Sequence, residues 1–272
     1  MSEDNPEQGY RGRLAPTPSG FLHKGHIQTF RTAWKRAVDN NGELIFRMDD
    51  LDPNRCTSEY KTACVEDMKK MGLDWQEGPD VGGSYGPYQQ SKRCDFYKGM
   101  LKKLFEMGCI YRCTKTRKEI RSAGLLDSLG LEFLYPENFR PQRTDDLRQD
   151  FRFDVNWRFR THWGDRVRFT DIKKAEQSFL VGSDLSDFLV WRKEGVASYE
   201  LATVVDDYLM RITEIVRGED LLLSSARQCL LFDTFGWNRP LFYHGDLVMG
   251  ENSEKLSKST KSGKNIRIFV ND

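Results

Sequence analysis

The chain has 272 residues, of which 31% are charged, and its formal net charge is +1. This balance excludes a strong overall electrostatic field that would draw the protein to nucleic acid or membranes, so an anionic partner must bind a local basic patch. The length predicts one large domain or two small ones. The six cysteines lack the spacing of a secreted disulfide framework, no apolar run of about 18 residues predicts a membrane span, and the polar start is unlike a signal peptide, so we expect a cytoplasmic protein without a membrane partner.

The first part of the sequence alternates predicted strands and helices. A short strand over 11–17 runs into a proline-rich loop, and residues 25–38 carry apolar side chains at helical spacing. A turn and a strand over 44–46 follow, then a helix over 58–71 and another over 91–107, each ended by a glycine. This alternation is typical of a parallel α/β sheet.

From about residue 109 the pattern changes. Arginine, aspartate and aromatic residues dominate, and runs such as FRFDVNWRFR and RVRFTDI predict antiparallel strands of an inserted α+β subdomain. A helix over 199–210 and a strand over 212–218 restore the α/β pattern before a Lys/Ser/Gly-rich end. We predict the first half of a catalytic domain over 1–108, the insertion over 109–185, the second half over 186–250, and a basic loop with a short tail over 251–272.

The stretch APTPSGFLHKGH joins the first strand to the first helix and contains two of the four histidines. A helix that begins after a strand presents free backbone N–H groups and a positive dipole end to an anion. Gly25 would let a ligand approach the backbone, and His23 and His26 face the same side and can donate hydrogen bonds to phosphate. The spacing alone fits two surface histidines equally well, and a zinc site would lack a nearby third ligand.

Near the other end, KLSKS at residues 255–259 predicts a basic loop. Lys255 and Lys258 can close over a triphosphate and neutralise the charge that develops on a leaving group. A solvated Lys/Ser tail is the usual alternative for such a run. The order of the two motifs on an interrupted α/β fold favours the catalytic interpretation.

HKGH and KLSKS resemble the His-Ile-Gly-His and Lys-Met-Ser-Lys-Ser signatures of class I aminoacyl-tRNA synthetases. The resemblance implies the Rossmann-like, parallel-sheet nucleotide-binding fold of that class, interrupted by an inserted α+β subdomain. Over about residues 11–260 the chain is similar to the catalytic domain of glutamyl-tRNA synthetases. The matching blocks are RLAPTPSGFLHKGH, FRMDDLDP, GLDWQEGP, YQQSKR, YELATVVDDYLMRITEIVRGEDLL and FGWNRPLFYH.

This resemblance implies activation of L-glutamate by ATP with Mg²⁺, which gives glutamyl-adenylate and pyrophosphate, and then transfer of glutamate to a tRNA. The protein would mainly position the reactants and stabilise charge while a carboxylate attacks the α-phosphate. The matched signatures imply catalytic roles for His23, His26, Lys255, Ser257 and Lys258. They imply ATP contacts for His23, Gly25, His26 and Lys258.

For the amino acid, Arg217 matches the arginine that is expected to hold the side-chain carboxylate, a task that suits a planar guanidinium. Asp49 stands where glutamyl enzymes usually have Glu, at the position that receives the substrate ammonium. Thr203 replaces an Asn found in many of these enzymes, and Asp206 and Asp207 stay unassigned. The implied glutamate-binding residues are Arg13, Ala15, Thr17, Asp49, Tyr199 and Arg217.

Full-length glutamyl-tRNA synthetases continue beyond the lysine loop into an anticodon-binding part, for which this sequence leaves no room. A truncated group, the glutamyl-queuosine tRNA(Asp) synthetases, attaches glutamate to the queuosine base in the anticodon loop of tRNA(Asp). The chain resembles this group also in the long EGPDVGGSYGPYQQSKR segment. We therefore expect a monomeric enzyme without an anticodon-binding domain, with L-glutamate and tRNA(Asp) as its partners.

Two alternatives remain open. One is a truncated enzyme that charges the 3′ end of tRNA(Glu) or tRNA(Gln), which only a test with defined tRNAs separates from the queuosine enzyme. The other is a paralogue that binds tRNA or an amino acid without turnover. Such a paralogue is expected to carry a broken signature, whereas here both histidines and both loop lysines are intact.

Relatives often carry zinc ligands in the insertion, as Cys-x-Cys followed by Tyr-x3-Cys. Here Cys113 and Tyr135 match, but Lys115 and Phe139 replace the other two ligands. Two ligands cannot hold a structural zinc, which needs four, so we expect no zinc. The aromatic residues expected to hold the insertion together, rather than to stack on RNA bases, are Phe133, Tyr135, Phe139, Trp157 and Trp163. The arginines that predict a tRNA-contacting face are Arg140, Arg143, Arg148, Arg152, Arg158 and Arg160.

Overall fold

The computed structural model describes residues 9–22, 24–142 and 150–247. Their contacts divide the chain into two compact units, which are taken here one at a time. Within the described ranges, every helix is too short or too polar to span a lipid bilayer. Unit 1 comprises Met1–Lys92, Leu209–Leu221 and Pro240–Asp272, and unit 2 comprises Arg93–Tyr208 and Leu222–Arg239.

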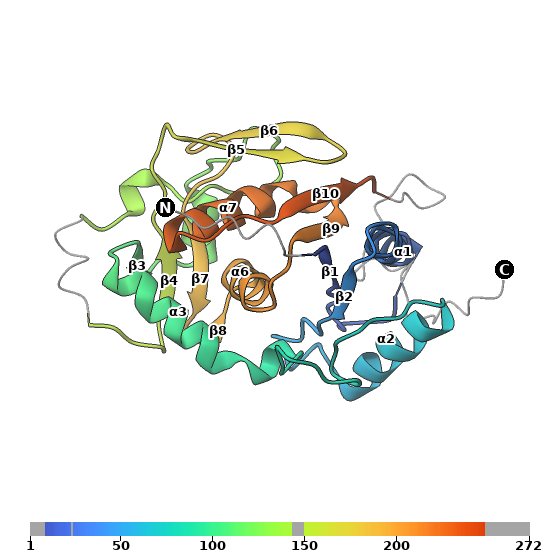
Figure 1. Cartoon of the computed structure of the whole chain (residues 1–272). Coiled ribbons are helices and arrows are strands. Elements are labelled where there is room, and N and C mark those ends of the chain that lie inside the picture. The colour runs from blue at the N-terminus through green and yellow to red at the C-terminus, as the bar shows by residue number, and fades with distance from the viewer. Residues whose placement is uncertain (1–8, 23, 143–149, 248–272) are drawn as a thin grey trace. The chain divides into compact units, whose positions relative to one another are not determined.

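Unit 1 is built on parallel strands from both ends of the sequence. Strand β1 (Arg11–Leu14) pairs with β2 (Glu43–Phe46), and β9 (Glu214–Gly218) pairs with β10 (Leu241–Gly245). Thr213 donates its backbone N–H to the carbonyl of Arg11 over 2.9 Å, so β9 runs beside β1. The blue and orange strands in Figure 1 therefore meet, although 202 positions separate those two residues in the sequence.

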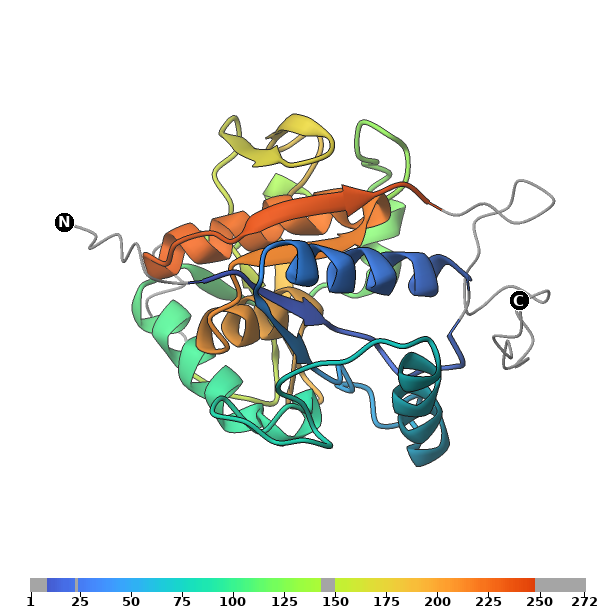
Figure 2. The same cartoon turned by 45° about the vertical axis from the view of Figure 1, so that its right-hand side comes forward.

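Helix α1 (Lys24–Asp39) connects β1 to β2. Its buried residues Phe30, Ala33 and Ala37 recur at the spacing of one helix face. This face packs across β1 and β9, and Figure 2 shows the helix lying over these strands. The other helices of unit 1 are α2 (Ser58–Lys70), η1 (Gln90–Lys92) and η3 (Glu219–Leu221).

Strand β1 is buried along its whole length although two of its four residues are arginines. A buried cation must be compensated, and Arg11 forms ion pairs with Glu43 and, over 2.7 Å, with Glu77. Its Nε also donates to the carbonyl of Met210 over 2.7 Å. These contacts explain how a strand that reads RGRL can occupy the centre of a unit.

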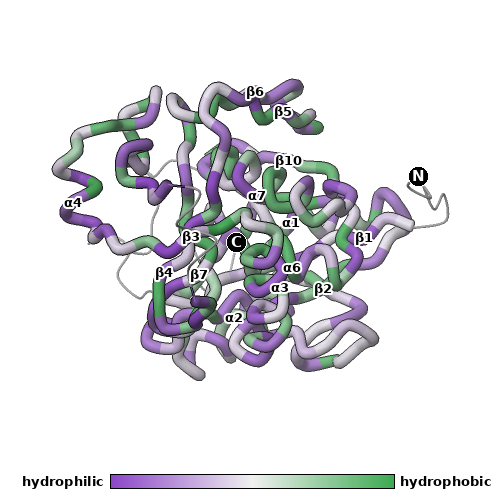
Figure 3. The backbone as a smooth tube through the Cα atoms, turned by 90° about the vertical axis from the view of Figure 1, so that its left-hand side faces the viewer, coloured by the Kyte–Doolittle hydropathy of each residue, from purple (hydrophilic) through white to green (hydrophobic). Residues whose placement is uncertain are grey.

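The strands of unit 2 are β3 (Ile110–Cys113), β4 (Asn156–Phe159), β5 (Arg166–Asp171), β6 (Ala175–Leu180), β7 (Phe188–Arg192) and β8 (Val196–Ala197). Strand β4 pairs antiparallel with β3 on one side and β7 on the other, and β7 pairs with β8. Trp157 and Trp191 face each other across β4 and β7 and are fully buried. Strands β5 and β6 form a hairpin, and Figure 3 shows hydrophilic and hydrophobic residues alternating along β5.

The helices of unit 2 are α3 (Cys94–Glu106), α4 (Arg117–Ser122), η2 (Glu137–Phe139), α6 (Tyr199–Leu209) and α7 (Leu222–Phe235). A buried polar cluster links α6 to the start of α3. Asp206 accepts hydrogen bonds from Nε of Arg93 (2.6 Å) and from the hydroxyl of Tyr97 (2.8 Å). All three side chains are almost completely buried, so Asp206 compensates a buried cation.

The predicted parallel α/β fold is confirmed, and the antiparallel strands expected in the insertion are present. Strand β7, which the sequence assigns to the second catalytic half, instead joins the antiparallel sheet of β3 and β4. Strand β10 was not predicted, because its LFYHG sequence lacks a clear apolar pattern. Phe133, expected in the core, is 43% exposed. Successive side chains of an extended segment point to opposite sides, and here Leu134 is the one that points inward. The domain boundaries stay a prediction.

Candidate active site

The parallel strands of unit 1 end in a group of charged side chains. Arg13 lies near the end of β1, Asp49 follows β2, and Arg217 and His244 lie near the ends of β9 and β10. Ligands of open parallel sheets bind at the carboxyl ends of the strands. Three of the residues implied in glutamate binding, Arg13, Asp49 and Arg217, therefore lie at the edge of unit 1 that the carboxyl ends of its strands form.

Arg217 and His244 face each other across β9 and β10. The parallel register pairs them, both are buried, and Nε of Arg217 donates to Nε2 of His244 over 3.3 Å. An imidazole nitrogen accepts a hydrogen bond only without its proton, so this contact favours the neutral tautomer that is protonated on Nδ1. The guanidinium carbon also lies 5.5 Å from the centre of the Phe242 ring. His244 thus orients the guanidinium without neutralising its charge.

Arg13 is a second buried arginine at this edge. Its Nη1 donates to the carbonyl of Val216 over 3.2 Å, directly before Arg217 in the chain. Two guanidinium groups on neighbouring strands form a cationic pole that suits a carboxylate. In the loop after β1, Ala15 is partly buried and Thr17 is exposed.

Asp49 has a partner that the sequence analysis missed. Arg47 is fully buried and makes two hydrogen bonds to the Asp49 carboxylate, from Nε to Oδ1 over 2.6 Å and from Nη2 to Oδ2 over 3.2 Å. The backbone N–H of Asp49 donates to the carbonyl of Pro16 over 2.9 Å, which ties the end of β2 to the loop after β1. A ligand ammonium would therefore meet a fixed carboxylate whose charge is shared with Arg47. The i, i+2 spacing in extended chain, which places both side chains on one face, is the signal for this pair.

The implied ATP contacts lie partly at the start of α1. His26 is partly buried in the first turn, and its ring is nearly parallel to that of Phe30 with centroids 6.2 Å apart. The carbonyl of Gly25 accepts a hydrogen bond from the hydroxyl of Thr29 over 3.1 Å. The predicted site residues that lie outside the described residues are His23, Lys255, Ser257 and Lys258.

Tyr199 is the implied pocket residue that belongs to unit 2. It begins α6 and is partly buried. Thr203, one turn later, is buried, and its hydroxyl has no hydrogen-bond partner among the described residues. The pocket role of Tyr199 stays a prediction.

The four positions that match zinc ligands in relatives come together in unit 2. The thiol of Cys113 lies 3.8 Å from the hydroxyl of Tyr135, and both side chains are buried. Nζ of Lys115 lies 4.8 Å from the centre of the Phe139 ring, which meets the Tyr135 ring edge to face at 6.0 Å. An amine and a phenyl ring supply no ligand pair for zinc at these positions, so the donor set does not fit the metal. A cation over an aromatic face, worth about 0.5–1 kcal/mol at exposed sites, stands there instead.

Arg158 completes this cluster. Its Nε lies 3.3 Å from the sulfur of Cys113, and its guanidinium carbon lies 4.2 Å from the centre of the Tyr135 ring. Burial, followed by the nearby thiol, raises the pKa of the Tyr135 hydroxyl above its usual value. In the part of the chain that the structure describes, no three His, Cys, Asp or Glu side chains are arranged to hold a metal, and the expected absence of zinc stays a prediction.

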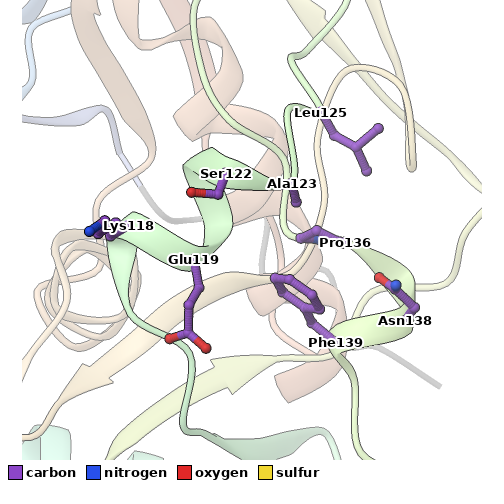
Figure 4. A pocket seen from close by; sticks show the side chains of 8 residues that line it. All are labelled: Lys118, Glu119, Ser122, Ala123, Leu125, Pro136, Asn138 and Phe139. Atoms are coloured by element: carbon purple, nitrogen blue, oxygen red, sulfur yellow. The ribbon is translucent and has the colours of Figure 1, made fainter.

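Phe139 also lines a cavity of about 590 Å³ beside α4. Figure 4 shows its ring extending from η2 toward the helix, with Pro136 and Asn138 on the same side of the cavity. Lys118 and Glu119 of α4 contribute to the lining. Phe139 of η2 also packs against the buried cluster that contains Ile120 of α4, so the cluster joins these two segments.

Comparisons with known proteins identify a family for this chain. Residues 10–268 match the model of the catalytic domain of class I tRNA synthetases (E and Q). The chain is 38% identical over 254 residues to the glutamyl-Q tRNA(Asp) synthetase of Nitratidesulfovibrio vulgaris. This match covers 93% of this chain and 78% of that protein. It is 37% identical to the protein of the same name from Symbiobacterium thermophilum, with 91% and 77% covered. It is 34% identical to the glutamate–tRNA ligase of Bacillus cytotoxicus, with 94% of this chain but only 53% of the ligase covered.

Solved structures agree with the sequence comparison. The glutamate–tRNA synthetase from Elizabethkingia anophelis has a TM-score of 0.77 and 28% identity, and the match covers 92% of this chain and 53% of that one. A glutamate tRNA ligase from Elizabethkingia meningosepticum, crystallised in complex with its amino acid, has the same TM-score and 27% identity, with 95% and 54% covered. The chain thus spans about half the length of these ligases, and the predicted Rossmann-like fold class is confirmed.

Proposed function

Because the chain belongs to the class I tRNA synthetases (E and Q) through their catalytic domain, we propose that it activates L-glutamate with ATP and Mg²⁺ and transfers it to queuosine in tRNA(Asp). Membership makes the protein a ligase of the aminoacyl-tRNA synthetase type. The observation that carries the choice of glutamate is the buried pair of Arg217 and His244.

A buried guanidinium selects a carboxylate over an amide. A guanidinium donates two parallel hydrogen bonds to a carboxylate of opposite charge, whereas the amide of glutamine offers a single acceptor oxygen and no charge. Because Nε already donates to His244, a carboxylate bound by two parallel hydrogen bonds would use Nη1 and Nη2. Asp49, held by Arg47, supplies the opposite pole for the substrate ammonium.

In the proposed activation step, the α-carboxylate of glutamate attacks the α-phosphate of ATP. The bond between the α-phosphate and the bridging oxygen breaks, and pyrophosphate leaves with Mg²⁺ bound as part of the substrate complex. His26 at the start of α1 would contact the phosphates, as helix N-termini favour anions. The roles of His23, Lys255, Ser257 and Lys258 rest on the resemblance alone.

The second step would pass glutamate from the adenylate to a hydroxyl of the queuosine ring, releasing AMP. Support comes from the two relatives that are named glutamyl-Q tRNA(Asp) synthetase. The match covers more than three quarters of each of these proteins. Charging of a tRNA 3′ end is the second candidate, because glutamate–tRNA ligases match nearly the same share of this chain.

The deciding experiment uses radiolabelled glutamate, ATP and tRNA(Asp) from which the 3′-terminal adenosine has been removed, so that only the base can accept the label. The matched control is the same tRNA with guanine in place of queuosine. Label on the queuosine tRNA alone supports the proposal. Label only on intact tRNA(Glu) supports the second candidate, and no glutamate-dependent reaction with any tRNA contradicts both.

A further inference from the structure

A second buried carboxylate follows Asp49 in the loop after β2. Asp50 is fully buried, and no step of the proposed reaction uses it. Its Oδ1 accepts a hydrogen bond from the backbone N–H of Ser91 over 2.9 Å, and its Oδ2 accepts one from the Ser91 hydroxyl over 2.7 Å. Nζ of Lys61 on α2 also donates to Oδ2 and forms an ion pair with the carboxylate. All of these residues belong to unit 1.

These contacts join two segments that are 41 positions apart in the sequence. Ser91 belongs to η1, and the chain just before it runs parallel to the end of β2. The backbone N–H of Met48 donates to the carbonyl of Tyr88 over 2.8 Å, and the N–H of Gln90 donates to the carbonyl of Met48 over 3.0 Å. The side chain of Asp50 therefore closes a short stretch of backbone pairing.

The place of Asp50 in the chain links this pairing to the proposed ammonium site. A planar peptide unit joins Asp50 to Asp49, and their Cα atoms are about 3.8 Å apart. Asp49 therefore lies between two anchors, which are the guanidinium of Arg47 before it and the Asp50 carboxylate after it. A misplacement of about 1 Å at a group that holds a substrate is costly, so both anchors matter for binding.

We propose that Asp50 is a positioning residue, which acts through Asp49 to fix the carboxylate that meets the substrate ammonium, an inference that rests on the proposed function. A buried ion pair is often no more stabilising than apolar side chains of similar volume, so orientation rather than stability explains a charge at this position. Asparagine has nearly the same shape but offers one acceptor oxygen in place of two, and its amide nitrogen would face a donor. Asp50→Asn therefore loosens the loop at Asp49 without leaving a cavity.

The test compares two buried carboxylates of unit 1. Asp50→Asn alters the first. The control, Glu214→Gln, alters a carboxylate at the start of β9, which pairs with Arg36 and accepts from the Tyr10 hydroxyl over 2.9 Å. This end of the strand lies opposite to the proposed site. Glutamate-dependent ATP–pyrophosphate exchange with saturating tRNA(Asp) gives the KM for glutamate, the KM for ATP and kcat, and thermal unfolding gives the stability of each variant.

Both variants should unfold at a lower temperature than wild type, because each leaves a buried cation less well compensated. Only Asp50→Asn should raise the KM for glutamate, by about tenfold, while its KM for ATP stays within about twofold of wild type. Ser91→Ala should raise the KM for glutamate about fivefold, because it removes one of the hydrogen bonds to the carboxylate. Ser91→Thr keeps the hydroxyl and should restore the wild-type value. Ser91 is exposed, so both of its variants should fold.

An equal KM for glutamate in Asp50→Asn and Glu214→Gln would overturn the positioning role while the proposed function stands. If Asp50→Asn does not fold, the Ser91 variants decide, and an unchanged KM for glutamate in Ser91→Ala overturns the role. If wild type shows no glutamate-dependent exchange, the positioning role and the proposed function are both overturned.

Discussion

The strand ends of unit 1 and a cavity of about 720 Å³ in unit 2, lined by six basic side chains, use positive charge in opposite ways. Arg47 and Arg217 are buried, and each is oriented by a neighbouring side chain at a defined edge of its guanidinium. Arg112, Arg117 and Lys193 are exposed around an open cavity. Burying a charge costs desolvation free energy, which only a partner with good geometry offsets. Exposed charges attract a ligand through their summed field, and salt screens that field. The first arrangement suits a small carboxylate, and the attraction exerted by the second depends on ionic strength.

The largest effect is expected when the buried ion pair of Arg47 and Asp49 in unit 1 is removed. Arg47→Ala would leave the Asp49 carboxylate buried without this cation, which should cost about 3–5 kcal/mol of stability. Thermal unfolding measures the effect. The matched control is Arg55→Ala, because Arg55 forms an exposed ion pair with Asp52 and its loss should cost less than about 1 kcal/mol. Equal shifts in the two variants would show that burial does not set the energy of the Arg47 pair.

Arg217→Gln tests the carboxylate site itself. Glutamate-dependent ATP–pyrophosphate exchange, measured with saturating tRNA, should fall roughly 100- to 1000-fold, as expected for the loss of a buried charged contact of about 3–4 kcal/mol. Arg217→Lys keeps the charge without the planar fork and should recover only part of the loss. An unchanged rate in the glutamine variant would remove Arg217 from the glutamate site.

How much the sequence predicts depends on where each partner lies. The RLAPTPSGFLHKGH and EIVRG blocks predicted Arg13 and Arg217 as glutamate-binding residues, because the resemblance aligned those residues one by one. The structure places both near strand ends of unit 1, and their role in binding stays a prediction. His244 was missed because it matters only through β10, a strand with no apolar pattern that pairs with β9. Arg47 was missed although its i, i+2 spacing from Asp49 is a signal for a shared face, because that spacing does not report the full burial on which its role depends. Non-local pairing and burial are therefore the parts that required coordinates.

His244 is expected to orient the guanidinium of Arg217. His244→Ala should raise the KM for glutamate about tenfold and lower kcat less, because the guanidinium keeps its charge but loses a hydrogen bond of about 1–2 kcal/mol. His244→Gln, which can still accept from Nε, should recover part of the affinity. A fall in kcat alone, with the KM for glutamate unchanged, would argue against an orienting role.

The smallest effect concerns the contact between Lys115 and Phe139 in unit 2. Lys115→Met keeps a side chain of similar length but removes the cation over Phe139, so stability should fall by about 0.5–1 kcal/mol. Urea unfolding resolves such a difference when wild type and variant are measured side by side. Lys102→Met on α3 is the control, because Lys102 is exposed and forms an ion pair with Glu106 one turn away. A larger loss in the control would mean that the cation over Phe139 contributes nothing.

The most direct measurement of the central claim is calorimetric binding of two non-hydrolysable adenylate analogues, one glutamyl and one glutaminyl, to wild type and Arg217→Gln. The account predicts that wild type prefers the glutamyl analogue by about 100-fold, roughly 2.7 kcal/mol, and that Arg217→Gln loses this preference. Equal binding of the two analogues by wild type, or an intact preference in the variant, would contradict a carboxylate site built on Arg217.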